Sequence, residues 1–117
     1  MISQMAEILA DYYVESRKHR RYTIDEPGSV CGVATGVRNI SRGGAQVACA
    51  PAALEAIGDK LHSVSVPFVL LVEPALTLSA RVVYQNQEDG VHLIGLQFVD
   101  MTPPQEAAIE RYVSSLA

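Results

Sequence analysis

Tryptophan is absent from this sequence, and aromatic residues make up only 6% of its 117 positions. Positive charge is also scarce, since nine lysines and arginines stand against 13 acidic residues and give a net charge of −4. Small barrels that bind single-stranded nucleic acid rely on stacking aromatics and broad positive charge. The scarcity of both therefore argues against a nucleic acid polymer as the partner.

Cysteines and long apolar runs are few as well. Cys31 and Cys49 lie in no CxxC or metal-type pairing, so we expect both to be reduced and buried. The longest apolar run, residues 66–72, is far shorter than the roughly 20 residues that span a membrane. The first residues carry acids and no early lysine or arginine, unlike a signal peptide. We expect a cytoplasmic protein without membrane insertion.

Signs of catalysis are also missing. The three histidines, His19, His62 and His92, lie on separate segments without metal-ligand spacing. No nucleophile with a base and an orienting group can be picked out, and no pair of catalytic carboxylates. We therefore expect a protein that is not an enzyme and that holds neither a metal nor a cofactor.

The composition that remains is typical of one globular domain, with 49% hydrophobic and 19% charged residues. Apolar residues at helical spacing after Ser3 predict a helix over residues 3–15. Thr102 as N-cap, with Gln105 completing a capping box, predicts a closing helix over about residues 103–116. Between them, β-branched or alternating segments predict six short strands, at 29–33, 35–40, 45–49, 61–72, 76–85 and 91–99, with a helical turn at 51–57.

This order of elements favours a mainly β fold. Closing six antiparallel strands into a small barrel would leave no exposed edge. We divide the chain into an N-terminal helix in residues 1–16 and a barrel domain with its closing helix in residues 17–117. Period-two alternation places Val64 and Tyr84 on the inward faces of their strands. Residues 25–28, with the sequence DEPG, predict a turn or a bulge.

The few positive charges are concentrated in one stretch. Residues 17–42 hold six cations and two anions within an acidic chain, which suits one small anion better than a polymer. Arg17 and Arg21 are four positions apart, so they lie on one side whether the segment is helical or extended. A guanidinium can grip phosphate, pair with the O6/N7 edge of guanine, or stack on a base. The alternative is a solvated basic linker.

The second candidate element is the sequence NISRGG, a strand that enters a turn. Asn39 and Ser41 are two positions apart, so we expect their amide and hydroxyl to point to the same side. Gly43 and Gly44 would permit a positive φ and close approach of a ligand to the backbone. The alternative is an ordinary hairpin turn with an Asx-type bond.

The ordered pair, RKHRR followed by NISRGG, resembles the paired signature of PilZ domains, R-x-x-x-R and (D/N)-x-S-x-x-G. The resemblance continues through LTLSARVVY and LIGLQFVDMTPPQEAAIERYV, so it covers residues 17 to about 113. It implies a split-barrel fold and a bacterial receptor for the second messenger cyclic di-GMP. In that family the arginine motif lies on an N-terminal segment that folds over the ligand, and motility, adhesion and matrix production are the usual outputs.

Carried over residue by residue, the resemblance assigns roles to the matching positions. Arg17 and Arg21 should contact phosphates and guanine, and Asn39 should bind a guanine edge or orient an arginine. Ser41 should contact phosphate or base, and Gly44 should keep the wall free of a side chain. Three further positions stay open. Arg20 stands where relatives often have proline, so it could loosen the segment or add a contact to the ligand. Arg42 could be an additional phosphate contact or merely exposed, and Tyr84 could face a guanine or belong to the barrel.

Three functions follow from the sequence. The first is a receptor or adaptor in which cyclic di-GMP is ordered between the arginine arm and the NISRGG turn, which changes a surface that a downstream protein reads. The second is an interaction module of the same fold that does not use the nucleotide site. The third is a barrel that binds single-stranded nucleic acid. Ser16 precedes the motif where many relatives have another arginine, so the sequence leaves open whether one or two ligands are bound.

Overall fold

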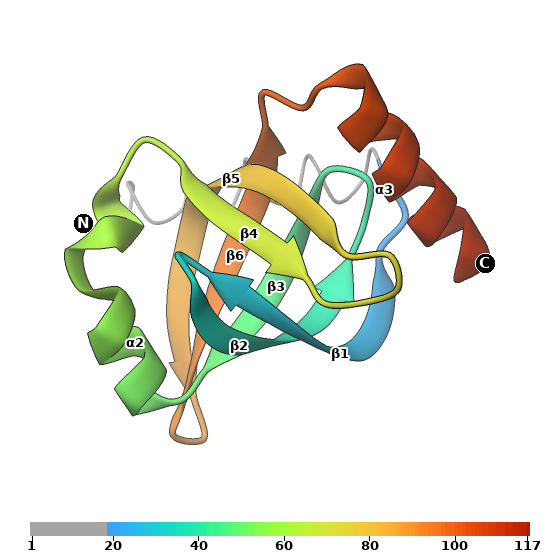
Figure 1. Cartoon of the computed structure of the whole chain (residues 1–117). Helices are drawn as coiled ribbons and strands as arrows, with labels where there is room; N and C mark the ends of the chain where they lie inside the picture. The colour runs from blue at the N-terminus through green and yellow to red at the C-terminus, as the bar shows by residue number, and fades with distance from the viewer. Residues whose placement is uncertain (1–18) are drawn as a thin grey trace.

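The computed structural model describes residues 19–117, in which six antiparallel strands close into a barrel in the order β1-β2-β3-β6-β5-β4 (Figure 1). The expected N-terminal helix and Arg17 lie outside the described residues. The strands are β1 (Tyr22–Val30), β2 (Val33–Ile40), β3 (Gly44–Cys49), β4 (Val66–Leu70), β5 (Leu76–Glu88) and β6 (Val91–Val99). The predicted six-stranded, mainly β barrel is therefore confirmed.

Inward-facing side chains of all six strands fill the barrel. The largest of these buried residues include Phe68, Ile40, Leu70, Ile94 and Leu96. Phe68 also stacks on Phe98, with ring centroids 5.8 Å apart. In β6 the expected inward residues Ile94 and Leu96 are buried and Gln97 is half-exposed, although Leu93 on the other face is also buried. Polar side chains at alternate positions are left on the outer wall.

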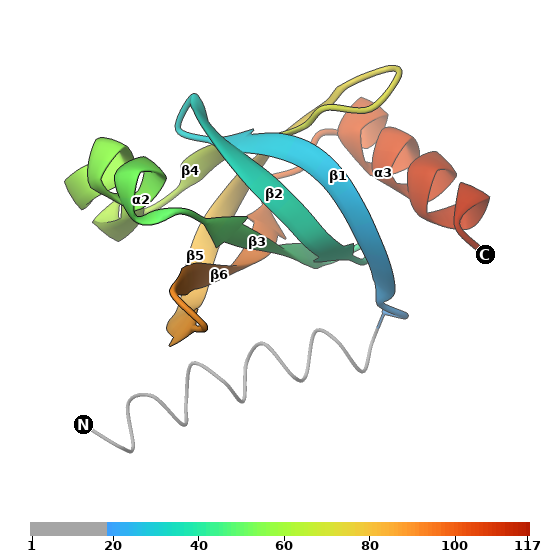
Figure 2. The same cartoon turned by 90° about the horizontal axis from the view of Figure 1, so that it is seen from below.

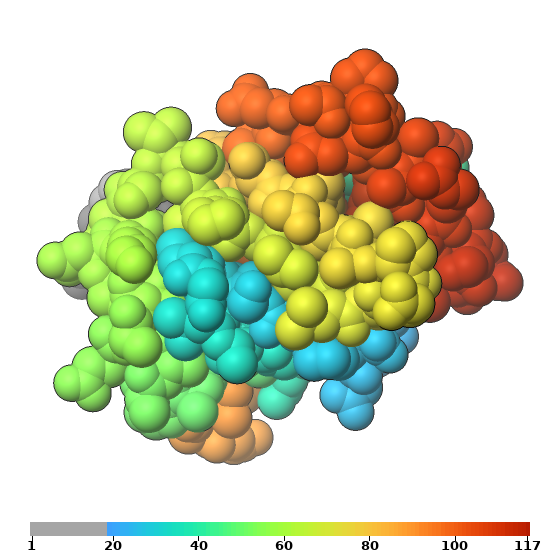
Figure 3. Space-filling view, in the orientation of Figure 1, coloured from blue at the N-terminus to red at the C-terminus, as the bar shows by residue number. Residues whose placement is uncertain are grey.

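Helices cover two opposite sides of the barrel. Helix α2 (Pro51–Ile57) and the short 3₁₀ helix η1 (Gly58–His62) lie on one side, and α3 (Pro103–Ser115) lies on the other, beside the start of β1 (Figure 2). Helix α3 begins with the predicted capping box, in which Thr102 Oγ1 accepts from the Gln105 amide at 3.3 Å. Ile109 and Val113 then pack into the core. The connection between β4 and β5 lies next to this helix (Figure 3).

One of the sequence-based expectations for β1 is confirmed and one needs revision. Of the turn or bulge predicted at DEPG, the structure has the bulge, because β1 runs through this stretch with a register shift between Thr23 and Glu26. Strand β1 ends at Val30 rather than continuing to Val33. Cys31 and Gly32 form the turn into β2 with φ values of 54° and 78°, the left-handed pair of a type I′ hairpin.

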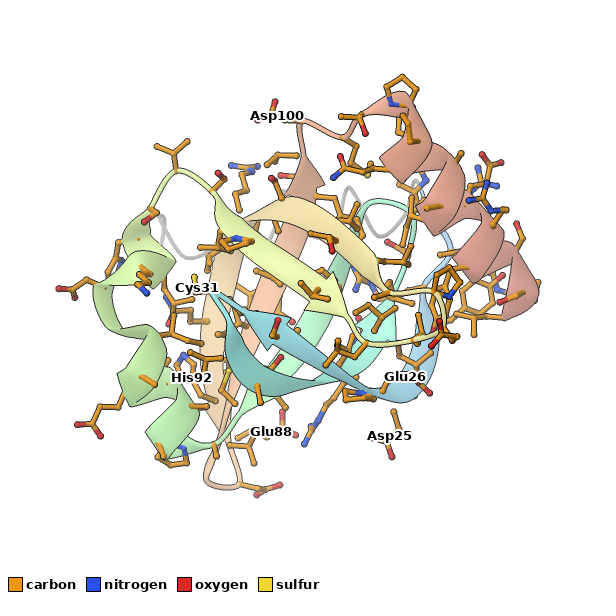
Figure 4. The ribbon with its side chains drawn as sticks, viewed as in Figure 1. Asp25, Glu26, Cys31, Glu88, His92 and Asp100 are labelled. Atoms are coloured by element: carbon orange, nitrogen blue, oxygen red, sulfur yellow. The ribbon has the colours of Figure 1, made fainter. Side chains whose placement is uncertain are left out.

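The two free cysteines therefore differ in environment. Cys49 is 1% exposed, and burial raises the pKa of its thiol. Cys31 lies at the tip of the β1–β2 hairpin and is only half-buried, contrary to the expectation that both would be buried (Figure 4).

Two alternation-based assignments are wrong for identifiable reasons. Val64 is 95% exposed because residues 58–62 form a 3₁₀ helix and β4 begins only at Val66. In β5 the ladder shifts register between Val82 and Tyr84. That bulge buries Val83 and turns the Tyr84 side chain to the outer face of the barrel.

Glycine at position 28 is required by crowding. A Cβ atom there would lie 2.7 Å from the Val69 carbonyl oxygen and 2.7 Å from Cγ2 of Val37, whereas one at Gly36 would meet nothing within 4 Å. We expect Gly28→Ala to lower the free energy of unfolding by about 1–3 kcal/mol, measured by urea denaturation. Gly36→Ala, one pair away on the facing strand, is the control and should change stability little. Equal stabilities for the two variants would contradict the tight packing of β1 against β4.

Candidate ligand-binding site

A row of directly paired residues crosses the outer wall of the barrel. Thr23 pairs with Asn39, Asn39 with Gln46, Gln46 with Gly95, and Gly95 with Tyr84. We call these five residues the cross-strand row. Both strand neighbours of Gln46 and of Gly95 are buried, as are Ile40 beside Asn39 and Val83 beside Tyr84, so the side chains of this row point outward. The row thus joins the end of β2, which carries the NISRGG motif, to β3, β6 and β5.

The ring of Tyr84 lies across Gly95. A Cβ atom at position 95 would be 2.0 Å from Cε1 of Tyr84 and 2.3 Å from Cδ1, which is far inside contact distance. Only glycine can occupy this position while the ring stays where it is. The ring spans β6, and its hydroxyl reaches the side chain of Gln46 on β3.

Hydrogen bonds connect the row to the basic segment. The Arg21 guanidinium donates to Oδ1 of Asn39, although the two residues are 18 positions apart in the sequence. Asn39 Nδ2 donates to Gln46 Oε1 at 3.2 Å, and Gln46 Nε2 donates to the Tyr84 hydroxyl oxygen at 2.5 Å. The predicted meeting of the basic segment with the NISRGG motif is therefore present for Arg21 and Asn39.

Ser41 occupies a different place from the one expected. Strand β2 ends at Ile40, and the chain then turns, so Ser41 does not share the outward face of Asn39. Its side chain is fully buried, and its hydroxyl oxygen accepts from the amides of Gly43 at 3.1 Å and Gly44 at 3.2 Å. The Ser41 hydroxyl therefore stabilises the turn through hydrogen bonds on its buried side.

The two glycines of the turn do not adopt unusual backbone angles, and Gly44 serves packing. Neither Gly43 nor Gly44 has a positive φ, contrary to expectation. A Cβ atom at Gly44 would lie 2.2 Å from the carbonyl oxygen of Leu96, its neighbour across the β3–β6 ladder. Gly44 thus permits the close approach of two strands.

Arg20 and Arg42 gather at a second location, beside α3. A cleft of about 330 Å³ lies between the basic segment and the C-terminal end of the chain, and its lining consists of His19, Arg20, Tyr22, Arg42, Val113, Ser114 and Ala117. The Arg20 guanidinium lies 5.2 Å from the centre of the Tyr22 ring. Arg42 forms an ion pair with Glu110 of α3 at 3.2 Å, with both side chains about half exposed.

The arrangement offers hydrogen-bond donors and positive charge to a ligand. Arg20 and Arg21 are adjacent, so the cleft and the cross-strand row meet at the segment that leads into β1. Guanidinium, amide and phenol groups can bind phosphate oxygens and the polar edges of bases.

Within residues 19–117, no three His, Cys, Asp or Glu side chains are grouped to hold a metal, and Cys31, Glu88, His92 and Asp100 lie apart (Figure 4). No helix of the described part is long and apolar enough to cross a membrane.

Comparison with known protein families assigns this chain to one of them. Residues 15–115 match the family described as PilZ domain. The chain therefore belongs to the PilZ domain family. A search of curated proteins gave no match.

Solved structures share the fold at low sequence identity. The Bacillus subtilis inhibitor of motility (MotI/DgrA) matches with a TM-score of 0.65 and 16% identity, over 85% of this chain and 49% of that one. The PilZ domain of Escherichia coli YcgR with c-di-GMP matches with a TM-score of 0.65 and 14% identity, over 86% of this chain and 90% of that one. The PilZ domain of CeSA from a cellulose-synthesizing bacterium matches with a TM-score of 0.56 and 23% identity, over 83% of this chain and 97% of that one. The chain thus spans about half the length of the first of these proteins.

The burial of the Ser41 hydroxyl yields a prediction about stability. Replacement by alanine leaves the amides of Gly43 and Gly44 without their acceptor, and an unsatisfied buried donor costs about 1–3 kcal/mol. We expect Ser41→Ala to lower the free energy of unfolding by at least that amount, measured by chemical denaturation. Ser65→Ala, at an exposed position, should be nearly neutral. A Ser41→Ala protein as stable as the original would contradict this role.

Proposed function

We propose that this protein is a receptor for cyclic di-GMP, bound between the basic segment and the NISRGG turn. The observation that carries the proposal is the hydrogen bond from Arg21 to Asn39, since it joins the two halves of the family signature. Membership in the PilZ family supports the same ligand, and so do the YcgR structures of similar fold, which contain c-di-GMP.

The ligand's chemistry matches the side chains available. It carries two phosphodiester charges and two guanines, and an arginine can serve either group. Arg21, oriented by Asn39, is proposed to donate to a phosphate or to a guanine edge. Arg17, in the same motif, is proposed as a second such contact. Ser41 and Gly44 set the shape of the turn that forms the floor of the site.

Arg20 and Arg42 extend the positive region toward α3. An exposed ion pair such as Arg42–Glu110 contributes little, typically less than about 1 kcal/mol. A ligand phosphate can therefore replace Glu110 as the partner of Arg42. We assign both arginines as supporting phosphate contacts at the side of the site nearest α3.

The proposed output is a change of surface rather than catalysis. Ligand bound at the basic segment would contact residues that also line the cleft against α3. This coupling would alter the surface around the end of that helix, where a downstream protein could read it. We propose a non-enzymatic, cytoplasmic adaptor role on this basis.

Isothermal titration with cyclic di-GMP tests the ligand assignment. The unmodified protein should bind, and Arg21→Ala should weaken binding about 10–100-fold, since a charged hydrogen-bond partner is lost. Arg111→Ala removes the same charge from an exposed position on α3 and should change affinity little. The absence of heat at hundreds of micromolar ligand in low salt would overturn the proposal.

The ion pair of Arg42 gives a separate test. Glu110→Gln releases Arg42 from its partner, so we expect about two- to fivefold tighter binding of cyclic di-GMP in low salt. The gain should shrink as salt is raised. Glu106→Gln, which removes a charge on the same helix without that ion pair, serves as the control. An equal effect of the two substitutions would show that Arg42 itself makes no contact.

A further inference from the structure

Two polar side chains of the cross-strand row, Gln46 and Tyr84, have no part in the ligand contacts proposed above. Both are half-buried, and both belong to the hydrogen-bonded chain that ends at Arg21. We propose that Tyr84 and Gln46 are positioning residues, which fix the Asn39 amide and through it the Arg21 guanidinium. The inference rests on the proposed function, because positioning has value only if Arg21 binds the ligand.

The polarity of the chain follows from its first member. A guanidinium can only donate, so Asn39 must present Oδ1 to Arg21. Its Nδ2 then faces Gln46 and needs an acceptor, which Oε1 of Gln46 provides. That leaves Nε2 of Gln46 facing Tyr84, whose hydroxyl oxygen accepts it. Each donor in the chain thus meets an acceptor, and the phenol is the final acceptor.

The backbone holds this final acceptor rigidly. The β5 bulge between Val82 and Tyr84 turns the tyrosine outward, and buried Val83 anchors the bulge from inside. The ring then lies against Gly95, where any larger residue would collide with it. A tyrosine fixed in this way gives Gln46 a stationary partner on β5, across β6 from β3.

A fixed chain would have a direct effect on binding. Without an anchor, the carboxamide of Gln46 is free to rotate, and so is that of Asn39. Rotating the Asn39 amide would turn its NH₂ group toward Arg21, a donor facing a donor. An arginine that is already oriented loses less conformational freedom when the ligand arrives, so binding is tighter.

The substitution Tyr84→Phe separates the hydroxyl from the ring. Phenylalanine keeps the ring on Gly95 and removes the hydroxyl oxygen that accepts from Gln46. We expect the affinity for cyclic di-GMP to fall about three- to tenfold, as for loss of one neutral hydrogen bond in a network. Gln46→Met should have a similar effect. Tyr112→Phe, on α3 and outside the row, should leave affinity unchanged, and all three variants should melt near the temperature of the original protein.

A double-mutant cycle shows whether Tyr84 acts through Asn39. In an Asn39→Ala background, Tyr84→Phe should produce no further loss of affinity, because the chain is already broken. The same loss in both backgrounds would mean that the hydroxyl touches the ligand directly, which overturns the positioning role. Unchanged affinity of Tyr84→Phe in the original background would overturn it too, and would leave the proposed function standing.

A ligand-free measurement distinguishes failure of this inference from failure of the proposed function. Side-chain amide signals of asparagine and glutamine are resolved in proton–nitrogen NMR spectra. We expect Tyr84→Phe to shift the Nδ2 signals of Asn39 in the free protein, while Tyr112→Phe does not. If the original protein bound no cyclic di-GMP, the proposed function would fall, whereas the chain would still be tested by this shift. Unmoved Asn39 signals would contradict the chain itself.

Discussion

The hydrogen bond between the Arg21 guanidinium and Oδ1 of Asn39 is the interaction on which the site depends. It fixes the basic segment that precedes β1 against the end of β2. Like charges concentrated in one short segment repel each other, and the barrel wall offers amide oxygens to this segment. The guanidinium is thereby oriented by a neutral amide oxygen on the barrel wall. An acidic chain can in this way present one cationic site to an anion.

The barrel reaches this arrangement through irregularities in its strands. Register shifts lie between Thr23 and Glu26, between Val37 and Asn39, and between Val82 and Tyr84. Each of the three adjoins a member of the cross-strand row. Bulges turn side chains that a regular strand would place elsewhere, and they are often found beside functional sites. The same irregularities that break the alternation pattern thus build the row.

Much of the fold could be predicted from the sequence, because it depends on local patterns. The capping box at Thr102, the closing helix and the later strands each follow from residues close together in the chain, whereas most of β1 (Tyr22–Val30) lies before the strand predicted at 29–33. The position of Tyr84 could not be predicted in this way, since a single extra residue in β5 reverses every later side chain. The prediction that Val64 faces inward was wrong for a similar reason, because a 3₁₀ helix interrupts the apparent alternation and leaves Val64 exposed.

The site was predictable to a smaller extent. The pairing of Arg21 with Asn39 was expected from the resemblance of the two motifs to a known family. The burial of Ser41 was not, because the chain leaves the strand one residue before it. Gln46 and Gly95 were missed altogether, since their roles depend on register between strands far apart in sequence. An outward-facing glutamine two residues after Gly44 becomes informative only once β3 is known to pair with β6.

The most direct test of the central claim is a backbone NMR titration of the protein with cyclic di-GMP. The largest shifts should fall on residues 19–22, on the NISRGG turn and on the neighbouring strands β2 and β3. Shifts at α2 and η1, on the opposite side of the barrel, should be small. Shifts confined to that opposite side, with residues 19–22 and Asn39 unmoved at saturation, would contradict a site built on the contact between Arg21 and Asn39.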